Sequence, residues 1–291
     1  MMGIFKAFKN GFLLTGKKSK LLVYLWVVNI AFALLLAIPF YQFISRGLSR
    51  SLMGDSVLQN VNFLWLGDVI YQAFEKGFSL GNGVIIPVLL FMVLYIFLNG
   101  GIVGRLVENG SDPITMKAFF SDCGFYFWRF FKLFLFSILL YAVFLGIING
   151  ITAGILNIFT QNASTAWPGF IARNIKMVVF LLSFSWVNML LDYTKIGIVV
   201  RQESGVLREW WNTVKFVKRH FWRTWGLYLF IGVLFLFISF IYLEIERFIP
   251  GNSSLLILVL FFWQQLYMVA KLWFKVNFFG SQIQMYRYYV Q

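Results

Sequence analysis

Residues 133–159 read LFLFSILLYAVFLGIINGITAGILNIF, a run of 27 residues without a single charged side chain. The hydrocarbon core of a bilayer is about 30 Å thick, and a helix that crosses it needs about 20 predominantly apolar residues. The run is long enough and contains few polar residues. It therefore predicts a transmembrane helix.

Five further segments have the same character, and with the first they predict an all-α polytopic membrane protein. The six predicted spans cover residues 21–44, 84–107, 133–159, 175–200, 225–243 and 255–279, within a single integral membrane domain of residues 1–291. The first span follows three lysines, as a signal peptide would. Its apolar run exceeds a typical signal sequence and no A-x-A-like site follows it, so we expect it to be retained.

The composition of the whole chain agrees with a membrane protein. Hydrophobic residues make up 60% of the chain, and charged residues only 12%. Soluble domains carry about 25% charged residues. A soluble fold with 36 Phe would expose much of its apolar surface, so the composition excludes an ordinary soluble enzyme, a disordered protein and a disulfide scaffold. With one Cys and one His in the chain, we expect no metal site and no cofactor.

The distribution of Lys and Arg predicts the orientation. Nineteen of the 25 basic residues lie on the side of the two termini, and six lie on the other side. Basic segments remain in the cytoplasm, so we predict both termini in the cytoplasm and a bacterial cytoplasmic (inner) membrane as the location. The basic inner face favours anionic lipid headgroups as partners over nucleic acid.

Residues 206–225 form the most informative connector. Apolar and aromatic side chains recur along it at i, i+3, i+4 and i+7 and include Trp210 and Trp211, whereas Lys215 and Arg219 lie on the opposite side. This pattern is typical of an amphipathic helix that lies in the membrane interface, where Trp prefers to sit. We expect this helix to lead into the fifth span and to contact lipid.

The spacing of aromatic pairs suggests an internal repeat. Residues 119–120 precede 133–134 by 14 positions, and residues 210–211 precede 224–225 by the same interval. With residues 5–20 as a degenerate third copy, the chain reads as three hairpins, each with an interfacial helix, a span out and a span in. The alternative is that any inward-facing connector of a membrane protein is basic and aromatic.

A stripe of small residues runs along the third span. Ala142, Gly146, Gly150 and Gly154 follow each other at intervals of four, which allows another helix to approach closely. The partner helix is either within this chain or in another subunit. The alternative is a flexible or hydrated helix that lines a cavity.

Charged residues near the inner ends of the spans are candidates for anion binding. Asp192 and Lys195 are three residues apart and share a helix face. Arg105 lies at a similar depth, and Lys271 and Lys275 are one turn apart. One interpretation is an ion pair with lysines that extend to the interface. The other is a basic pocket for a lipid headgroup or another anion.

Polar groups deeper in the membrane are uncharged. Asn29, Asn188, Gln264 and Gln265 either form hydrogen bonds across helices or line a polar path. No carboxylate is predicted near the middle of the membrane, which weakens the case for a coupled transporter. No catalytic residue is predicted either, because the neighbouring cations disfavour His220 as a base.

Residues 192–228 contain a span end, a basic connector and the start of the next span. The residues that carry this pattern are Asp192-Tyr193-Thr194-Lys195, Glu203, Leu207, Trp211, His220 and Tyr228. The stretch resembles a poorly characterised group of bacterial six-span inner-membrane proteins. In layout, most of the chain is similar to the membrane domain that accompanies some glycerophosphodiester phosphodiesterases. The resemblance implies a lipid-associated module, and without the soluble phosphodiesterase domain it does not imply hydrolase activity.

These observations favour a non-enzymatic membrane protein that binds anionic lipid or organises other membrane components. Other membrane proteins or a second copy of the chain are further partners. A transporter or permease for a small or lipidic solute is the alternative. An intramembrane enzyme is the least favoured hypothesis.

Overall fold

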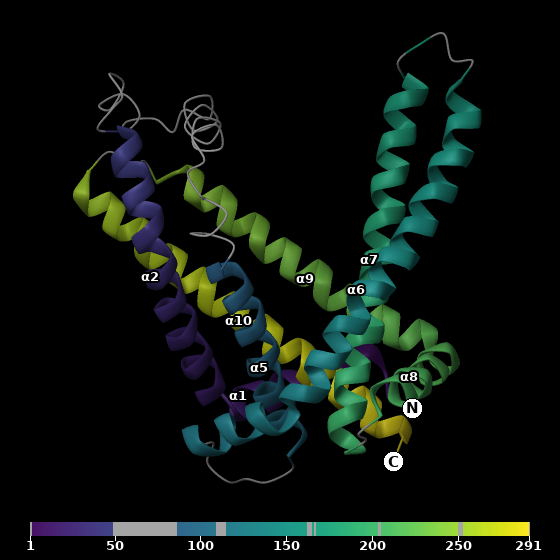
Figure 1. Ribbon diagram of the computed structural model, residues 1–291, viewed down its shortest axis with the longest axis horizontal. Coiled ribbons are helices and arrows are strands. Elements are labelled where there is room, and N and C mark those ends of the chain that lie inside the picture. Colours follow the sequence, from purple (N-terminus) through teal and green to yellow (C-terminus); the bar gives the residue numbers. More distant parts are fainter. Residues whose placement is uncertain are drawn as a thin grey trace. The chain divides into compact units, whose positions relative to one another are not determined.

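The computed structural model describes residues 2–48, 86–108, 115–161, 165, 167–202, 205–249 and 253–290. Over these residues the chain is helical, and no strand occurs among them. The helices are α1 (Ile4–Lys17), α2 (Lys20–Leu48), α5 (Ile86–Val107), α6 (Met116–Thr160), α7 (Trp167–Val200), α8 (Val206–Arg219), α9 (Phe221–Arg247) and α10 (Ser254–Val290), as Figure 1 shows.

Six of these helices, α2, α5, α6, α7, α9 and α10, are long and apolar enough to cross a membrane. Each contains most of one predicted span, so the predicted all-α polytopic fold is confirmed. The first two residues of the second predicted span, 84 and 85, lie outside the described residues. Large apolar side chains on these helices are exposed, including Ile158 at 72% and Phe159 at 75%. A hydrocarbon environment accommodates such surfaces, whereas water disfavours them.

The chain divides into two compact units. Unit 1 contains Met1–Ser19, Ile96–Ile238 and Trp273–Gln291, and unit 2 contains Lys20–Tyr95 and Ser239–Leu272. The helix α8 and both pockets described below lie within unit 1.

Contacts between aromatic and amide side chains hold unit 2 together. The rings of Phe32 on α2 and Phe91 on α5 lie 5.4 Å apart. Trp26 donates a hydrogen bond from Nε1 to Oε1 of Gln265 on α10 at 3.2 Å. This bond confirms for Gln265 the cross-helix role predicted for the amides. Asn29 differs, because it donates to the carbonyl of Leu25 on its own helix.

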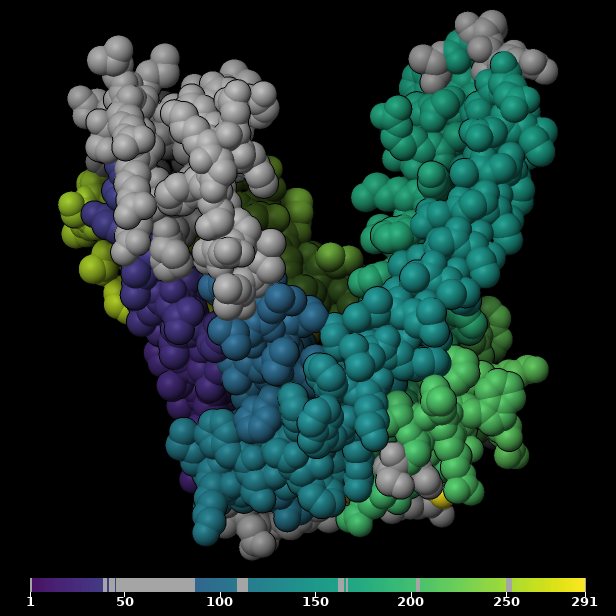
Figure 2. All heavy atoms as spheres, in the orientation of Figure 1, coloured from purple at the N-terminus to yellow at the C-terminus, as the bar shows by residue number. Residues whose placement is uncertain are grey.

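In unit 1, α6 and α7 lie side by side (Figure 1, Figure 2). Tyr141 on α6 donates its hydroxyl hydrogen to Oδ1 of Asn188 on α7 at 2.6 Å. One turn further along, the rings of Phe144 and Trp186 are 5.1 Å apart. Asn188 therefore also forms the predicted bond across helices.

The stripe of small residues on α6 faces away from α7. Ala142, Gly146, Gly150 and Gly154 are exposed, and a Cβ built at any of the three glycines meets no heavy atom within 4 Å outside the backbone of the helix. The predicted close approach of a helix from the same chain is therefore not found among the described residues. The physical reason is that α6 packs on α7 through the face that carries Tyr141.

Three helical segments cross the ends of three spans at glycines. In each case a Cβ on the glycine would overlap the neighbouring segment, so glycine permits the close approach. The contacts are Gly101 of α5 with Cys123 of α6, Gly197 of α7 with Glu209 of α8, and Gly11 of α1 with Ser281 of α10. The three segments that make these contacts with a span end are the predicted interfacial helices. This recurrence supports the interpretation of the chain as three repeated hairpins.

The helices α1 and α8 also end in the same way. Each has 14 residues and ends at a residue with similar backbone angles, φ −108° and ψ 29° at Lys18, and φ −122° and ψ 29° at His220. The predicted helix over residues 206–225 is therefore broken at His220, because a helix packed along α7 must turn before it continues as the span α9. The segment before the third span has no such break, since α6 continues through it.

Candidate functional site

The helix α8 is anchored by a buried carboxylate, Glu209. Its side chain is fully buried, and its Oε1 accepts a hydrogen bond from the hydroxyl of Tyr286 on α10 at 3.1 Å. Its Oε2 accepts from Nδ2 of Asn212 at 3.3 Å and lies 3.8 Å from Nη1 of Arg201. A buried carboxylate is tolerated only with such partners. These contacts therefore hold α8 against α7 and α10.

Glu209 was not among the residues predicted from the sequence to form a site. The available signal was an acidic residue inside a basic segment, four residues before Thr213, with which it shares the buried face. Its partner Tyr286 is 77 residues away, so no local pattern indicated their contact.

The opposite side of α8 carries most of the predicted lipid-binding residues. Leu207 is 63% exposed and Trp211 is 54% exposed. Lys215 and Arg219 are also exposed, and Nζ of Lys215 lies 5.8 Å from the ring centroid of Trp211. An exposed face therefore combines apolar, aromatic and cationic side chains. The prediction that Lys215 lies on the side opposite Trp211 is wrong, because residues four apart share one face of a helix.

Trp210 is placed differently from the other predicted residues of α8. Its ring packs edge-on against Phe136 of α6, with 5.2 Å between the ring centroids. It is only partly exposed. Trp210 therefore contributes to the attachment of α8 to α6.

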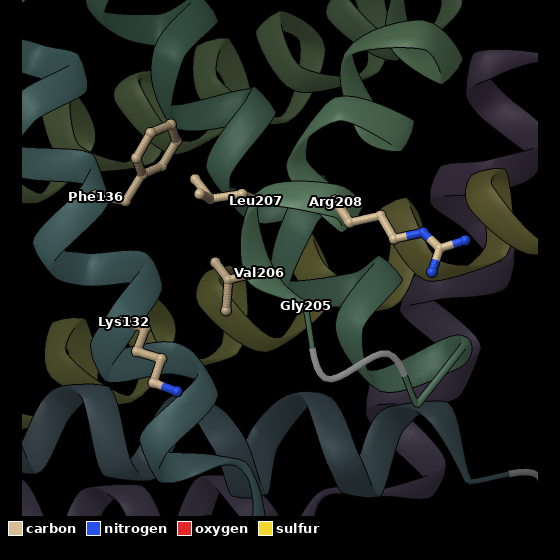
Figure 3. A pocket seen from close by; sticks show the side chains of 6 residues that line it. All are labelled: Lys132, Phe136, Gly205, Val206, Leu207 and Arg208. Atoms are coloured by element: carbon tan, nitrogen blue, oxygen red, sulfur yellow. The ribbon is translucent and has the colours of Figure 1, made fainter.

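A pocket of about 480 Å³ lies between α6 and the start of α8. Figure 3 shows Phe136 on α6 facing Leu207 on α8, with Lys132 one turn from Phe136. The residues that line this pocket are Lys132, Phe136, Gly205, Val206, Leu207 and Arg208. The lining combines apolar side chains with two cationic ones, a composition suited to the boundary between acyl chains and headgroups.

Arg105 forms a cluster with carboxylates that sequence analysis did not identify. Its Nε lies 2.5 Å from Oδ2 of Asp122 on α6, and its Nη1 lies 2.6 Å from Oε2 of Glu108. Arg105 is therefore paired with Asp122 and Glu108, and Asp192, which lies at a similar predicted depth, is paired with Lys195 instead. The packing of α5 against α6 at Gly104 explains the difference, because Asp122 contacts that glycine.

Cationic side chains also donate hydrogen bonds to the carbonyl groups at the end of α5. Lys18 donates from Nζ to the carbonyl of Arg105 and, at 2.8 Å, to that of Glu108. Arg287 donates to the carbonyl of Val107. The last carbonyls of a helix lack partners within it, and these side chains supply them. The pKa of Lys18 is lowered by burial, and the nearby carboxylate of Glu108 opposes this shift only in part.

The ion pair between Asp192 and Lys195, expected from their spacing, is present. Nζ of Lys195 lies 2.8 Å from Oδ1 of Asp192 and 5.7 Å from the ring centroid of Phe279 on α10. Lys275 lies in unit 1, and Lys271 lies in unit 2, where it is exposed. The described contacts thus place Lys195 and Arg105 in different ion pairs and do not assemble the predicted pocket.

No group of three or more His, Cys, Asp or Glu side chains among the described residues is placed to hold a metal ion. The exposed face of α8 instead offers cations beside aromatic and aliphatic surface. Comparison of the chain with protein-family models, with curated proteins and with solved structures found no match.

Proposed function

We propose that this multi-pass membrane protein binds anionic lipid headgroups through the exposed face of α8 and acts without catalysing a reaction. The observation that carries the proposal is the exposed combination of Leu207, Trp211 and Lys215 on a helix anchored by Glu209. We place this face at the cytoplasmic side of a bacterial inner membrane, as the distribution of Lys and Arg predicts. The resemblance to the six-span bacterial group stays a prediction that agrees with this role.

Binding through this face depends on the difference between an aqueous and an interfacial environment. An exposed Trp ring and Leu side chain are unfavourable in water but favourable at the headgroup level, where the Trp N–H stays hydrated. Each Lys or Arg near an anionic surface adds about 1 kcal/mol of attraction. The rigid attachment of α8 lets both contributions act at once, because the face needs no ordering on binding.

Transport is the second candidate, and buried amides on α10 favour it. Asn277 and Gln282 are fully buried. The Nδ2 of Asn277 and both polar atoms of the Gln282 side chain have no hydrogen-bond partner among the described residues. Unpaired buried polar groups call for water or a solute. Hydroxyl-radical labelling of α10 in the folded protein would reveal a hydrated path, and protection of this segment would count against transport.

The lipid proposal is tested by native mass spectrometry of the full chain in detergent. Phosphatidylglycerol and phosphatidylcholine are titrated in parallel, and their dissociation constants are compared. The ratio of the two dissociation constants measures the preference for phosphatidylglycerol. We expect this preference to fall about tenfold in the Trp211→Ala/Lys215→Gln variant, because the variant lacks one charge and one ring. Trp210 is left intact because its ring packs on α6.

The matched control removes an exposed tryptophan and lysine elsewhere. Trp167 and Lys176 on α7 are both exposed and lie on the side predicted to be external. Trp167→Ala/Lys176→Gln should leave the preference unchanged. Equal affinity of the wild-type protein for the two lipids, or equal losses in both variants, would refute the proposal.

A further inference from the structure

A second pocket of about 380 Å³ lies beside the C-terminal ends of α8 and α10. It is lined by Arg201, Asn212, Lys215, Phe216, Arg219, His220, Tyr289 and Val290. Phe216 links the two helices through a ring contact with Tyr286, with 4.8 Å between the centroids. The pocket thus belongs to unit 1 and rests on packed elements.

The lining of this pocket is strongly cationic. Arg201, Lys215 and Arg219 carry positive charge, and no carboxylate occurs among the described residues that line the pocket. Arg201 lies 3.8 Å from Glu209. Glu209 is fully buried and does not line the pocket, and its carboxylate offsets one of the three positive charges. Gathering the remaining like charges around a concave site is unfavourable unless an anion enters it.

An aromatic wall and a histidine complete the pocket. The ring of His220 stacks on Tyr289 with 4.1 Å between the centroids, and Arg223 of α9 donates a hydrogen bond to the hydroxyl oxygen of Tyr289. Burial, together with the nearby Arg219 and Arg223, lowers the pKa of His220. The imidazole is therefore largely neutral at pH 7, and an anion beside it would favour its protonation.

We propose that this pocket binds a dianionic phosphomonoester, which deepens the lipid-binding role proposed above and rests on it. A phosphomonoester carries about −1.5 to −2 charge at pH 7 and three acceptor oxygens. This negative charge matches the positive charge that remains on the pocket after Glu209 offsets one of its three cations. A phosphodiester carries a single negative charge and would neutralise less of that positive charge. The guanidinium of Arg219 and the ammonium of Lys215 supply charge-assisted donors to those oxygens.

The test uses the full chain in detergent with three defined ligands. Phosphatidate carries the phosphomonoester on a lipid, glycerol 3-phosphate carries it in solution, and phosphatidylglycerol is the diester comparison. We expect phosphatidate to bind more tightly than phosphatidylglycerol. In the Arg219→Gln/His220→Gln variant this advantage should fall about tenfold. Binding of glycerol 3-phosphate as well would identify the headgroup chemistry as sufficient, and binding of phosphatidate alone would identify a lipid source.

Two controls separate the site from general effects of charge and folding. Arg173→Gln/Lys176→Gln removes two exposed cations of α7 and should leave the advantage of phosphatidate intact. Arg219→Lys keeps the charge and should retain most of the binding. Equal affinity of the wild-type protein for phosphatidate and phosphatidylglycerol, or an unchanged advantage in the pocket variant, would overturn the pocket alone. If the wild-type protein bound phosphatidylglycerol no more tightly than phosphatidylcholine but still bound phosphatidate, only the proposed lipid-binding function of the α8 face would be overturned.

Discussion

The helices α1 and α8 share a length and a termination, yet their buried faces differ in chemistry. In α1 the buried residues are Ala7, Gly11 and Thr15, so backbone approaches backbone. In α8 the buried face includes Glu209, which joins three elements through its carboxylate. A helix of the same length can therefore be attached to the end of a span either by close packing or by a polar network. Only the polar attachment adjoins the two pockets described here.

The strongest test of this contrast is removal of the carboxylate. Glu209→Ala should destabilise the protein by about 3 kcal/mol, because Arg201 and Tyr286 lose a buried partner. Thermal unfolding of the detergent-solubilised protein measures the effect. The control is Glu244→Ala, because Glu244 is a partly exposed acid on α9 that pairs with the exposed Arg247. A smaller loss of stability in Glu209→Ala than in Glu244→Ala would show that the network is not the anchor of α8.

The packed attachment of α1 should be the next most sensitive. A Cβ at Gly11 would lie 2.5 Å from the backbone nitrogen of Ser281, so Gly11→Ala should cost about 2 kcal/mol through overpacking. Gly16→Ala on the same helix is the control, because nothing lies within 4 Å of a Cβ at that position. Equal unfolding temperatures for the two variants would show that α1 is not tightly packed on α10.

The residues that end the two helices should also differ in effect. Lys18→Met should destabilise by about 1–2 kcal/mol, since the carbonyls of Arg105 and Glu108 lose their donor. His220→Gln should leave the unfolding temperature nearly unchanged, because its main role is at the edge of the pocket. Comparable losses in both variants would contradict this division.

Protonation of His220 should link pH to anion binding. Sulfate is a suitable ligand because it does not titrate between pH 8 and pH 5.5. The pKa of His220 is lowered in the free protein, and a bound anion raises it, so binding takes up a proton at pH values above the pKa of the free protein. Sulfate should therefore bind several-fold more tightly as pH falls. Arg219, Arg223 and Tyr289 face the ring. His220→Gln should remove the pH dependence; a wild-type affinity independent of pH would contradict the link.

The smallest effect is expected on the exposed stripe of α6. Gly150→Ala meets no neighbouring atom, so it should be neutral or stabilise by up to about 1 kcal/mol through helix propensity. Measurement of unfolding temperature beside Gly11→Ala gives the direct contrast between an open and a packed glycine. A loss of stability at Gly150 that depends on protein concentration would instead indicate a second copy on this face.

Much of the fold was predictable from sequence because it depends on local properties. The length and apolarity of the run at residues 133–159 predict a span without knowledge of its neighbours. The pairing of Asp192 with Lys195 follows from the spacing of three residues along one helix. The approximate position of α8 follows from its periodic pattern in the same way.

The candidate sites depended on contacts that no local pattern encodes. Lys18 reaches the end of α5 across 87 and 90 positions of sequence, and Glu209 reaches Tyr286 across 77. Six apolar helices and the basic character of their connectors follow from local sequence, because hydrophobic length and charge are properties of each segment. The tertiary structure alone decided which carboxylate binds Arg105, which face of α8 is buried and where the cations gather around a pocket, because helix packing selects one partner among many of equal local character.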